Sequence, residues 1–154
     1  MFTSSRLPRL LFLCLVAASF GFLSCTQHKH PTEPRVPDQR LAEAKALKAP
    51  FGEARSASPE IVAEGKRLFD SKACVHCHGP EGKGNGPAAN KSRQHPPRDF
   101  SDCKWHEKRT DGEIYWVLDH GVPGTAMVDQ VPHHLTEAQA WKVVAYLRTL
   151  CTFQ

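Results

Sequence analysis

Apolar side chains recur at helical spacing in three stretches of the chain, and the first stretch begins near residue 58. Ser58 is a favourable N-cap residue, and Pro59 suits the first position of a helix, where an N–H group has no partner within the helix. The apolar positions that follow share one helical face: Ile61, Gly65, Leu68 and Phe69. The pattern predicts a helix that runs directly to Cys74.

The other two stretches each open with a capping box, in which two side chains three positions apart bond each other's backbone N–H groups. Thr110 and Glu113 form one box, and Gly121 ends the helix that follows. Thr136 and Gln139 form the other box. The apolar positions are Ile114, Val117 and Leu118 in one helix and Trp141, Val144, Ala145 and Leu147 in the other. No β-hairpin or βαβ pattern is apparent, so we predict an all-α fold.

The N-terminus has the polarity of an export signal. Arg6 and Arg9 precede an uncharged, mostly apolar run (10–23) that is short for a membrane span and typical of a signal-peptide core. We predict a signal peptide over 1–24, with an uncleaved anchor helix as the alternative. Ser24 and Cys25 end a sequence that resembles a bacterial lipoprotein cleavage site, where the cysteine becomes lipidated. Cys25 would then hold the exported protein at the periplasmic or extracytoplasmic face of a bacterial membrane.

Residues 25–57 contain several prolines, mixed charges and almost no large apolar side chains. This composition predicts a flexible tether over 26–57, so that 25–57 would form a lipid-anchored N-terminus and tether if Cys25 is lipidated. A strap packed on the domain is the alternative. The folded domain is expected over 58–154.

The most specific chemical motif is Cys74-Val75-His76-Cys77-His78. Two thiols three positions apart, followed at once by a histidine, form the attachment motif of a covalent c-type haem. Cys74 and Cys77 can reach the two vinyl groups of the porphyrin, and His78 then lies where its ring can ligate the iron. A redox dithiol and half of a zinc site are the alternatives. The zinc site is disfavoured because no other cysteine has a near cysteine partner.

A long stretch rich in Gly and Pro, without clear periodicity, lies between Cys77 and Thr110. A loop of this length is unusual in a small domain, and a large buried cofactor supplies apolar surface that such loops can wrap. Gly82, Gly84 and Gly86 follow no predicted strand and lack the spacing of a phosphate-binding loop. We expect them to form a turn whose backbone passes close to the haem.

The cysteines also suggest a disulfide. Of six in the 154-residue chain, Cys14 would leave with the signal peptide, one would take lipid and two would take haem. Cys103 and Cys151 remain, in an oxidising compartment. A bond between them would close a loop of 47 residues (104–150) and contribute up to about 4 kcal/mol. Two unrelated buried thiols are the alternative.

The charge of the chain is nearly balanced. Its net charge is +4, from 20 Lys and Arg against 16 Asp and Glu, and loss of Arg6 and Arg9 with the signal peptide leaves +2. No basic block stands out, so nucleic acid is not an expected partner.

Haem iron in an electron carrier usually has a second protein ligand, for which Met127 is the main candidate. It is the only methionine after the signal peptide, and it follows Gly121, Pro123 and Gly124 on a loop. Its neutral thioether favours ferrous iron and raises the reduction potential. The alternatives, which would give a lower potential, are His95, His106, His120, His133 and His134.

Taken together, these features resemble a class I c-type cytochrome with a single haem. The likeness covers residues 57–150 and rests on the order of four segments: 65–69 (GKRLF), 74–79 (CVHCHG), 121–127 (GVPGTAM) and 141–148 (WKVVAYLR). It implies a small cytochrome c fold, with three main helices and long loops wrapped around one covalent haem. It also implies that the first and last helices cross near Gly65, and that Pro96 or Pro97 accepts a hydrogen bond from His78 through its carbonyl.

A weaker, local likeness links residues 96–100 (PPRDF) to single-haem subunits of membrane-bound respiratory complexes. Arg98, Lys104 or Trp105 could bond a haem propionate. A haem with both axial positions filled implies a one-electron carrier in a respiratory or related redox chain, with protein donors and acceptors and no catalytic residues. A fixed electron-relay subunit of a membrane oxidoreductase complex is one alternative. A haem peroxidase or gas sensor with a labile sixth ligand is the other.

Overall fold

The computed structural model describes residues 32–90 and 95–151. The predicted signal peptide over 1–24, the predicted lipidation site Cys25 and residues 26–31 lie outside the described residues. Within the two described ranges all regular structure is helical and no strand occurs, as the sequence predicts. No helix in these ranges has the length and apolar character needed to cross a membrane.

The three helices expected from the sequence form the frame of the domain. They are α2 (Pro59–Ser71), α5 (Asp111–His120) and α6 (Glu137–Thr149). The Ser58 hydroxyl accepts a hydrogen bond from the N–H of Ile61, and both predicted capping boxes are present. Two shorter helices, α3 (Cys74–His78) and α4 (Cys103–Lys108), lie between α2 and α5 in the chain. The cap residues therefore set where the main helices begin.

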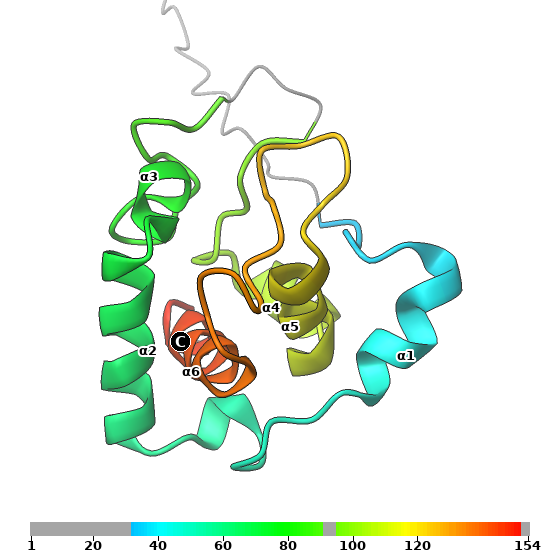
Figure 1. Cartoon of the computed structure of the whole chain (residues 1–154), viewed down its shortest axis with the longest axis vertical. Coiled ribbons are helices and arrows are strands. Elements are labelled where there is room, and N and C mark those ends of the chain that lie inside the picture. Colours follow the sequence, from blue (N-terminus) through cyan, green and yellow to red (C-terminus); the bar gives the residue numbers. More distant parts are fainter. Residues whose placement is uncertain (1–31, 91–94, 152–154) are drawn as a thin grey trace, which may run out of the picture.

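Helices α2 and α6 pack on each other, and their contact depends on Gly65. In Figure 1, α6 is seen almost end-on beside α2, so the two helices cross steeply. A Cβ atom at Gly65 would overlap the backbone carbonyl oxygen of Lys142 and lie 3.0 Å from Cβ of Tyr146. One turn later the rings of Phe69 and Tyr146 pack with their centroids 5.4 Å apart. The missing side chain therefore lets the two backbones meet.

Gly65→Ala is expected to lower the free energy of unfolding by about 3 kcal/mol, because the added methyl group forces α2 away from α6. On an isolated helix the same change would be stabilising by about 1 kcal/mol, so the sign of the effect tests the packing. Chemical denaturation measures it. The control is Arg67→Ala on the same helix. The Arg67 side chain is 66% exposed, so its loss should hardly change the free energy of unfolding. A Gly65→Ala protein as stable as the wild type would contradict the expectation.

The prediction of a flexible tether over 26–57 is wrong for residues 32–57. These residues form a strap packed on the domain. This N-terminal strap contains α1 (Leu41–Ala46), the short 3-10 helices η1 (Asp38–Arg40) and η2 (Ala54–Ser56), and extended backbone between them.

Small side chains allow the N-terminal strap to pack closely. Val36 and Ala44 are buried against Trp116 of α5, and Ala54 is buried in the main core. The N–H of Ala54 also donates to the carboxylate of Asp111 over 2.9 Å. Because alanine and valine bury little area each, the composition of this segment resembles that of a solvated chain, although it has a surface to cover.

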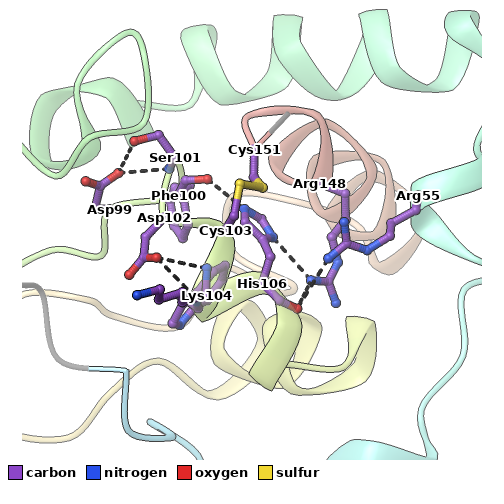
Figure 2. The surroundings of a disulfide bond; sticks show 11 residues. Arg55, Asp99, Phe100, Ser101, Asp102, Cys103, Lys104, His106, Arg148 and Cys151 are labelled. Atoms are coloured by element: carbon purple, nitrogen blue, oxygen red, sulfur yellow. Dashed lines mark hydrogen bonds between the residues drawn. A yellow bond between two sulfur atoms is a disulfide. The ribbon is translucent and has the colours of Figure 1, made fainter. Parts of the chain in front are cut away.

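A disulfide between Cys103 and Cys151 ties the start of α4 to the end of α6, with Cα atoms 5.2 Å apart (Figure 2). Of the two alternatives that the sequence left for these cysteines, the structure has the disulfide. Beside it lies Arg148 of α6, which is 5% exposed. Its guanidinium donates to the Asp111 carboxylate over 2.6 Å and to the backbone carbonyl of His106 over 3.0 Å. Together the covalent and polar contacts join α6 to α4 and to the start of α5.

Candidate functional site

Helices α2 to α6, the loops that connect them and part of the N-terminal strap line a cavity of about 750 Å³. This volume falls within the roughly 300–1,000 Å³ of sites that bury small molecules and cofactors. Apolar side chains from α2, α5 and α6 line it: Phe69, Ile114, Leu118, Val143 and Leu147. Cys74, Cys77, His78 and Met127 line the same cavity. The fold therefore brings the four side chains predicted to bind a haem to one apolar site.

His78 is held by two contacts from a single segment. Its Nδ1 lies 3.1 Å from the carbonyl oxygen of Arg98. Because a carbonyl can only accept, Nδ1 carries the proton and Nε2 keeps its lone pair. The Phe100 ring stacks on the imidazole with centroids 4.5 Å apart. Burial lowers the pKa of His78 to about 4, so the ring is neutral at pH 7, as a metal ligand must be.

The expectation that Pro96 or Pro97 accepts this hydrogen bond is wrong, since the acceptor is the next residue, Arg98. The carbonyl oxygen of Pro97 faces Gly84 instead, where it lies 2.6 Å from the position that a Cβ atom would take. Gly84 also donates its N–H to the His78 carbonyl over 2.8 Å. Close packing of these backbones selects the acceptor, and residue order alone does not reveal it.

The glycine-rich turn packs behind the haem-attachment motif. Gly84 and Gly86 donate their N–H groups to the carbonyls of His78 and Cys77, over 2.8 and 3.1 Å. The backbone of this turn was expected to pass close to the haem. In the structure it contacts the backbone of α3, because small residues there let the two backbones approach each other.

The two thiols of the motif are half-buried and unbonded to each other. Burial raises the pKa of the Cys74 thiol to about 11, whereas a reactive redox dithiol needs a lowered thiol pKa. In residues 32–90 and 95–151 no three His, Cys, Asp or Glu side chains are grouped as a metal-binding cluster. Neither the dithiol nor the zinc alternative therefore gains support from the residues around these cysteines.

Met127 lies on a loop that is held by its own hydrogen bonds. Its carbonyl accepts from the N–H of Val122 over 2.7 Å, and its N–H donates to the hydroxyl of Thr125 over 3.0 Å. That hydroxyl donates in turn to the Val122 carbonyl over 2.8 Å. The Met127 side chain is half-buried against the main core. The loop thus presents the thioether to the cavity in a defined position.

The histidine alternatives to Met127 divide into two groups. His95 and His134 also line the cavity, and both are exposed. The other three have contacts elsewhere. His106 bonds the Phe100 carbonyl, His120 stacks on Trp116, and His133 lies 3.5 Å from Asp129.

Three arginines, Arg35, Arg98 and Arg109, line the cavity. Arg98 is 8% exposed and donates Nη2 to the Glu33 carbonyl, while its Nε and Nη1 are buried without a partner among the described residues. Burial, together with the neighbouring positive charges of Arg35 and Arg109, lowers the pKa of Arg98 to about 10. Arg109 pairs with Glu113 over 2.6 Å. A buried guanidinium with unpaired N–H groups calls for an anionic partner.

Of the side chains named from the sequence for a propionate contact, Arg98 and Trp105 line the cavity and Lys104 is exposed. Arg35 and Arg109 were missed. Arg35 belongs to the segment interpreted as a tether, and no pattern along the chain marks either residue as part of a site.

A family model gives the decisive comparison. The model for cytochrome c matches residues 62–151, more than half of the chain. The chain belongs to the cytochrome c family. The cytochrome accordingly binds haem c covalently, and its chemistry is haem-based electron transfer. The described residues fit that cofactor, since the cavity combines two thiols, a neutral imidazole, a thioether and a buried, unpaired guanidinium.

One solved structure similar to the cytochrome is the reducing HAO-like protein complex Kustc0457/Kustc0458 of Kuenenia stuttgartiensis. The TM-score is 0.54 and the sequence identity is 27%. The likeness covers 62% of this chain and 46% of that chain, so the cytochrome spans less than half of its neighbour's length. A search of the curated proteins found no match.

Proposed function

We propose that the cytochrome passes single electrons between protein partners through one haem, held by thioether bonds to Cys74 and Cys77 and by His78 and Met127 as axial ligands. The observation that carries this proposal is that these four side chains, from α3 and from the loop after α5, line one apolar cavity. When bound, the haem supplies an iron that changes between the ferric and ferrous states.

The surrounding residues suit this role. The hydrogen bond from His78 to the Arg98 carbonyl fixes the imidazole and raises its donor strength. The neutral thioether of Met127 favours the ferrous state. Apolar side chains such as Phe69, Ile114 and Leu118 line the cavity and would limit the access of water to the ring. With His78 and Met127 both on the iron, no axial position would be left for a substrate. These features favour a carrier over a peroxidase or a gas sensor.

Spectroscopy of the purified cytochrome tests the proposal. The ferric protein should show the weak charge-transfer band at the red end of the spectrum that marks sulfur ligation. The ferrous protein should bind carbon monoxide only slowly, because Met127 must first leave the iron. Ready binding of carbon monoxide without that band would support the peroxidase or gas-sensor alternative instead.

We also propose that the cytochrome is exported and lipid-anchored through Cys25. The packed N-terminal strap supports a short connection, since Arg109 donates to the Thr32 carbonyl over 2.8 Å and six residues (26–31) separate Thr32 from Cys25. A chain of that length reaches about 25 Å when fully extended. Fractionation of cells that express the Cys25→Ala protein tests the anchor. The proposal requires the wild type in the membrane fraction and the variant in the soluble exported fraction.

A fixed electron relay within a larger membrane oxidoreductase complex is the second candidate. The short connection favours it over a widely ranging carrier, and the similar solved structure is a protein complex. Gentle purification from native membranes distinguishes the two. A relay elutes with other subunits in constant proportion, whereas a mobile carrier elutes alone.

Arg98→Gln is expected to lower the reduction potential by about 59 mV, a tenfold change in the one-electron equilibrium. The positive charge of Arg98 lies in the wall of the haem cavity and favours the ferrous state, while the backbone carbonyl that holds His78 is retained. Protein-film voltammetry measures the shift. The control is Arg40→Gln, because Arg40 lies on the N-terminal strap in an exposed pair with Glu43. Equal potentials in the Arg98→Gln protein and the wild type would contradict a role near the haem.

A further inference from the structure

His106 lies outside the haem cavity, and the proposed function does not use it. It is 1% exposed. In Figure 2 its Nε2 faces the Phe100 carbonyl over 2.6 Å and its Nδ1 faces the guanidinium of Arg148 over 3.2 Å. A guanidinium can only donate and a carbonyl can only accept, so Nδ1 accepts and Nε2 carries the proton. Burial lowers the pKa of His106 to about 4, which keeps the ring neutral. His106 is therefore a fixed hydrogen-bond donor to Phe100.

The segment that His106 holds is the one that orients His78. Its first residue, Arg98, accepts the hydrogen bond from Nδ1 of His78 over 3.1 Å. Its last residue, Phe100, stacks its ring on the same imidazole. The N–H of Phe100 donates to the carbonyl of Gly82 over 2.7 Å. Residues 98–100 thus lie between His78 on one side and His106 on the other.

The position of His106 is itself determined by two distant parts of the chain, the N-terminal strap and the C-terminal segment from Arg148 to Cys151. Arg148 of α6 donates to both the ring and the backbone carbonyl of His106. Arg55 of the N-terminal strap donates to the same carbonyl over 3.3 Å. Cys103, one turn earlier on α4, is joined to Cys151 by the disulfide. These contacts leave the ring little freedom to move away from Phe100.

We propose that His106 is a positioning residue for His78. By holding residues 98–100 against the imidazole, it maintains the Arg98–His78 hydrogen bond and thereby tunes the reduction potential of the haem. The inference rests on the proposed function, in which His78 ligates the iron. A weaker hydrogen bond at Nδ1 makes His78 a poorer electron donor, which favours the ferrous state and raises the potential.

Three variants of the haem-loaded protein test this role. His106→Leu removes the donor. The reduction potential should rise by about 28 mV, which corresponds to about a threefold change in the one-electron equilibrium constant. The substitution should also speed exchange of the His78 Nδ1–H proton, followed by NMR of the ferrous protein. His106→Gln should stay close to wild type, because an amide can donate to Phe100 and accept from Arg148. Leu135→Ala is the control for lost stability, since Leu135 is buried in the same core and does not line the cavity.

A raised potential with faster exchange in His106→Leu, and in neither other variant, supports the proposal. A wild-type potential in His106→Leu overturns it, as does an equal shift in Leu135→Ala. If His106→Leu does not fold, His106→Asn carries the same expectation, because its shorter amide does not span to the Phe100 carbonyl. A wild-type protein without covalent haem would overturn the proposed function itself. If the wild type carries haem and the substitutions of His106 leave its reduction potential unchanged, only this inference is overturned.

Discussion

Replacing Met127 by alanine is expected to lower the reduction potential by on the order of 200–300 mV, within the roughly 0.8 V range that axial ligands set. The neutral thioether favours ferrous iron, and water in its place favours ferric iron. The same variant should lose the charge-transfer band at the red end of the spectrum and bind carbon monoxide readily. A potentiometric titration with optical spectra measures all three effects.

His95→Ala and His134→Ala are the matched controls for this prediction, because both histidines line the cavity with Met127. Each should keep the potential and the charge-transfer band of the wild type. A change of spectrum in either histidine variant, together with a wild-type spectrum in Met127→Ala, would assign the distal position to histidine. The proposed His/Met ligation would then be wrong.

The second large effect is expected at the disulfide. The Cys103→Ser/Cys151→Ser protein should lose about 4 kcal/mol of unfolding free energy, because the bond restricts a long loop (104–150) in the unfolded chain. The folded structure itself should change little, since Arg148 still joins α6 to Asp111. Denaturation by guanidinium chloride, followed by far-UV circular dichroism, measures the change.

The wild type treated with a thiol reductant is the control, since it separates the bond from the serine substitutions. A reductant opens the disulfide and leaves the thioether bonds to haem intact. It should lower the stability by nearly as much as the double substitution. A stability loss below about 1 kcal/mol in both proteins would contradict the chain-entropy account of this disulfide.

The main helices could be predicted because their signals are local. Ser58, Thr110 and Thr136 each accept a hydrogen bond from an N–H group three residues later, so a short stretch of sequence determines where each helix begins. The haem motif is equally local, because two thiols and an imidazole at fixed spacing already match one edge of a porphyrin. Neither prediction depends on how the helices pack.

The N-terminal strap and the proximal hydrogen bond could not be predicted in this way. Val36 and Ala44 look like parts of a solvated chain until Trp116 is seen to cover them. The hydrogen bond to His78 comes from Arg98 because Gly84 brings the loop backbones together and turns the Pro97 carbonyl elsewhere. Both depend on residues that are remote along the chain.

By itself the sequence determined the cofactor chemistry and the all-α frame, since covalent haem attachment and helix capping are matters of spacing between near neighbours. Only the tertiary structure decided that Cys103 pairs with Cys151, that Arg35 and Arg109 join Arg98 at the cavity, and that His106 lies behind Phe100. The physical reason is that each of these depends on the approach of distant backbones. Gly65 shows the difference most simply: a residue that weakens a helix in isolation is the one that lets α2 and α6 meet.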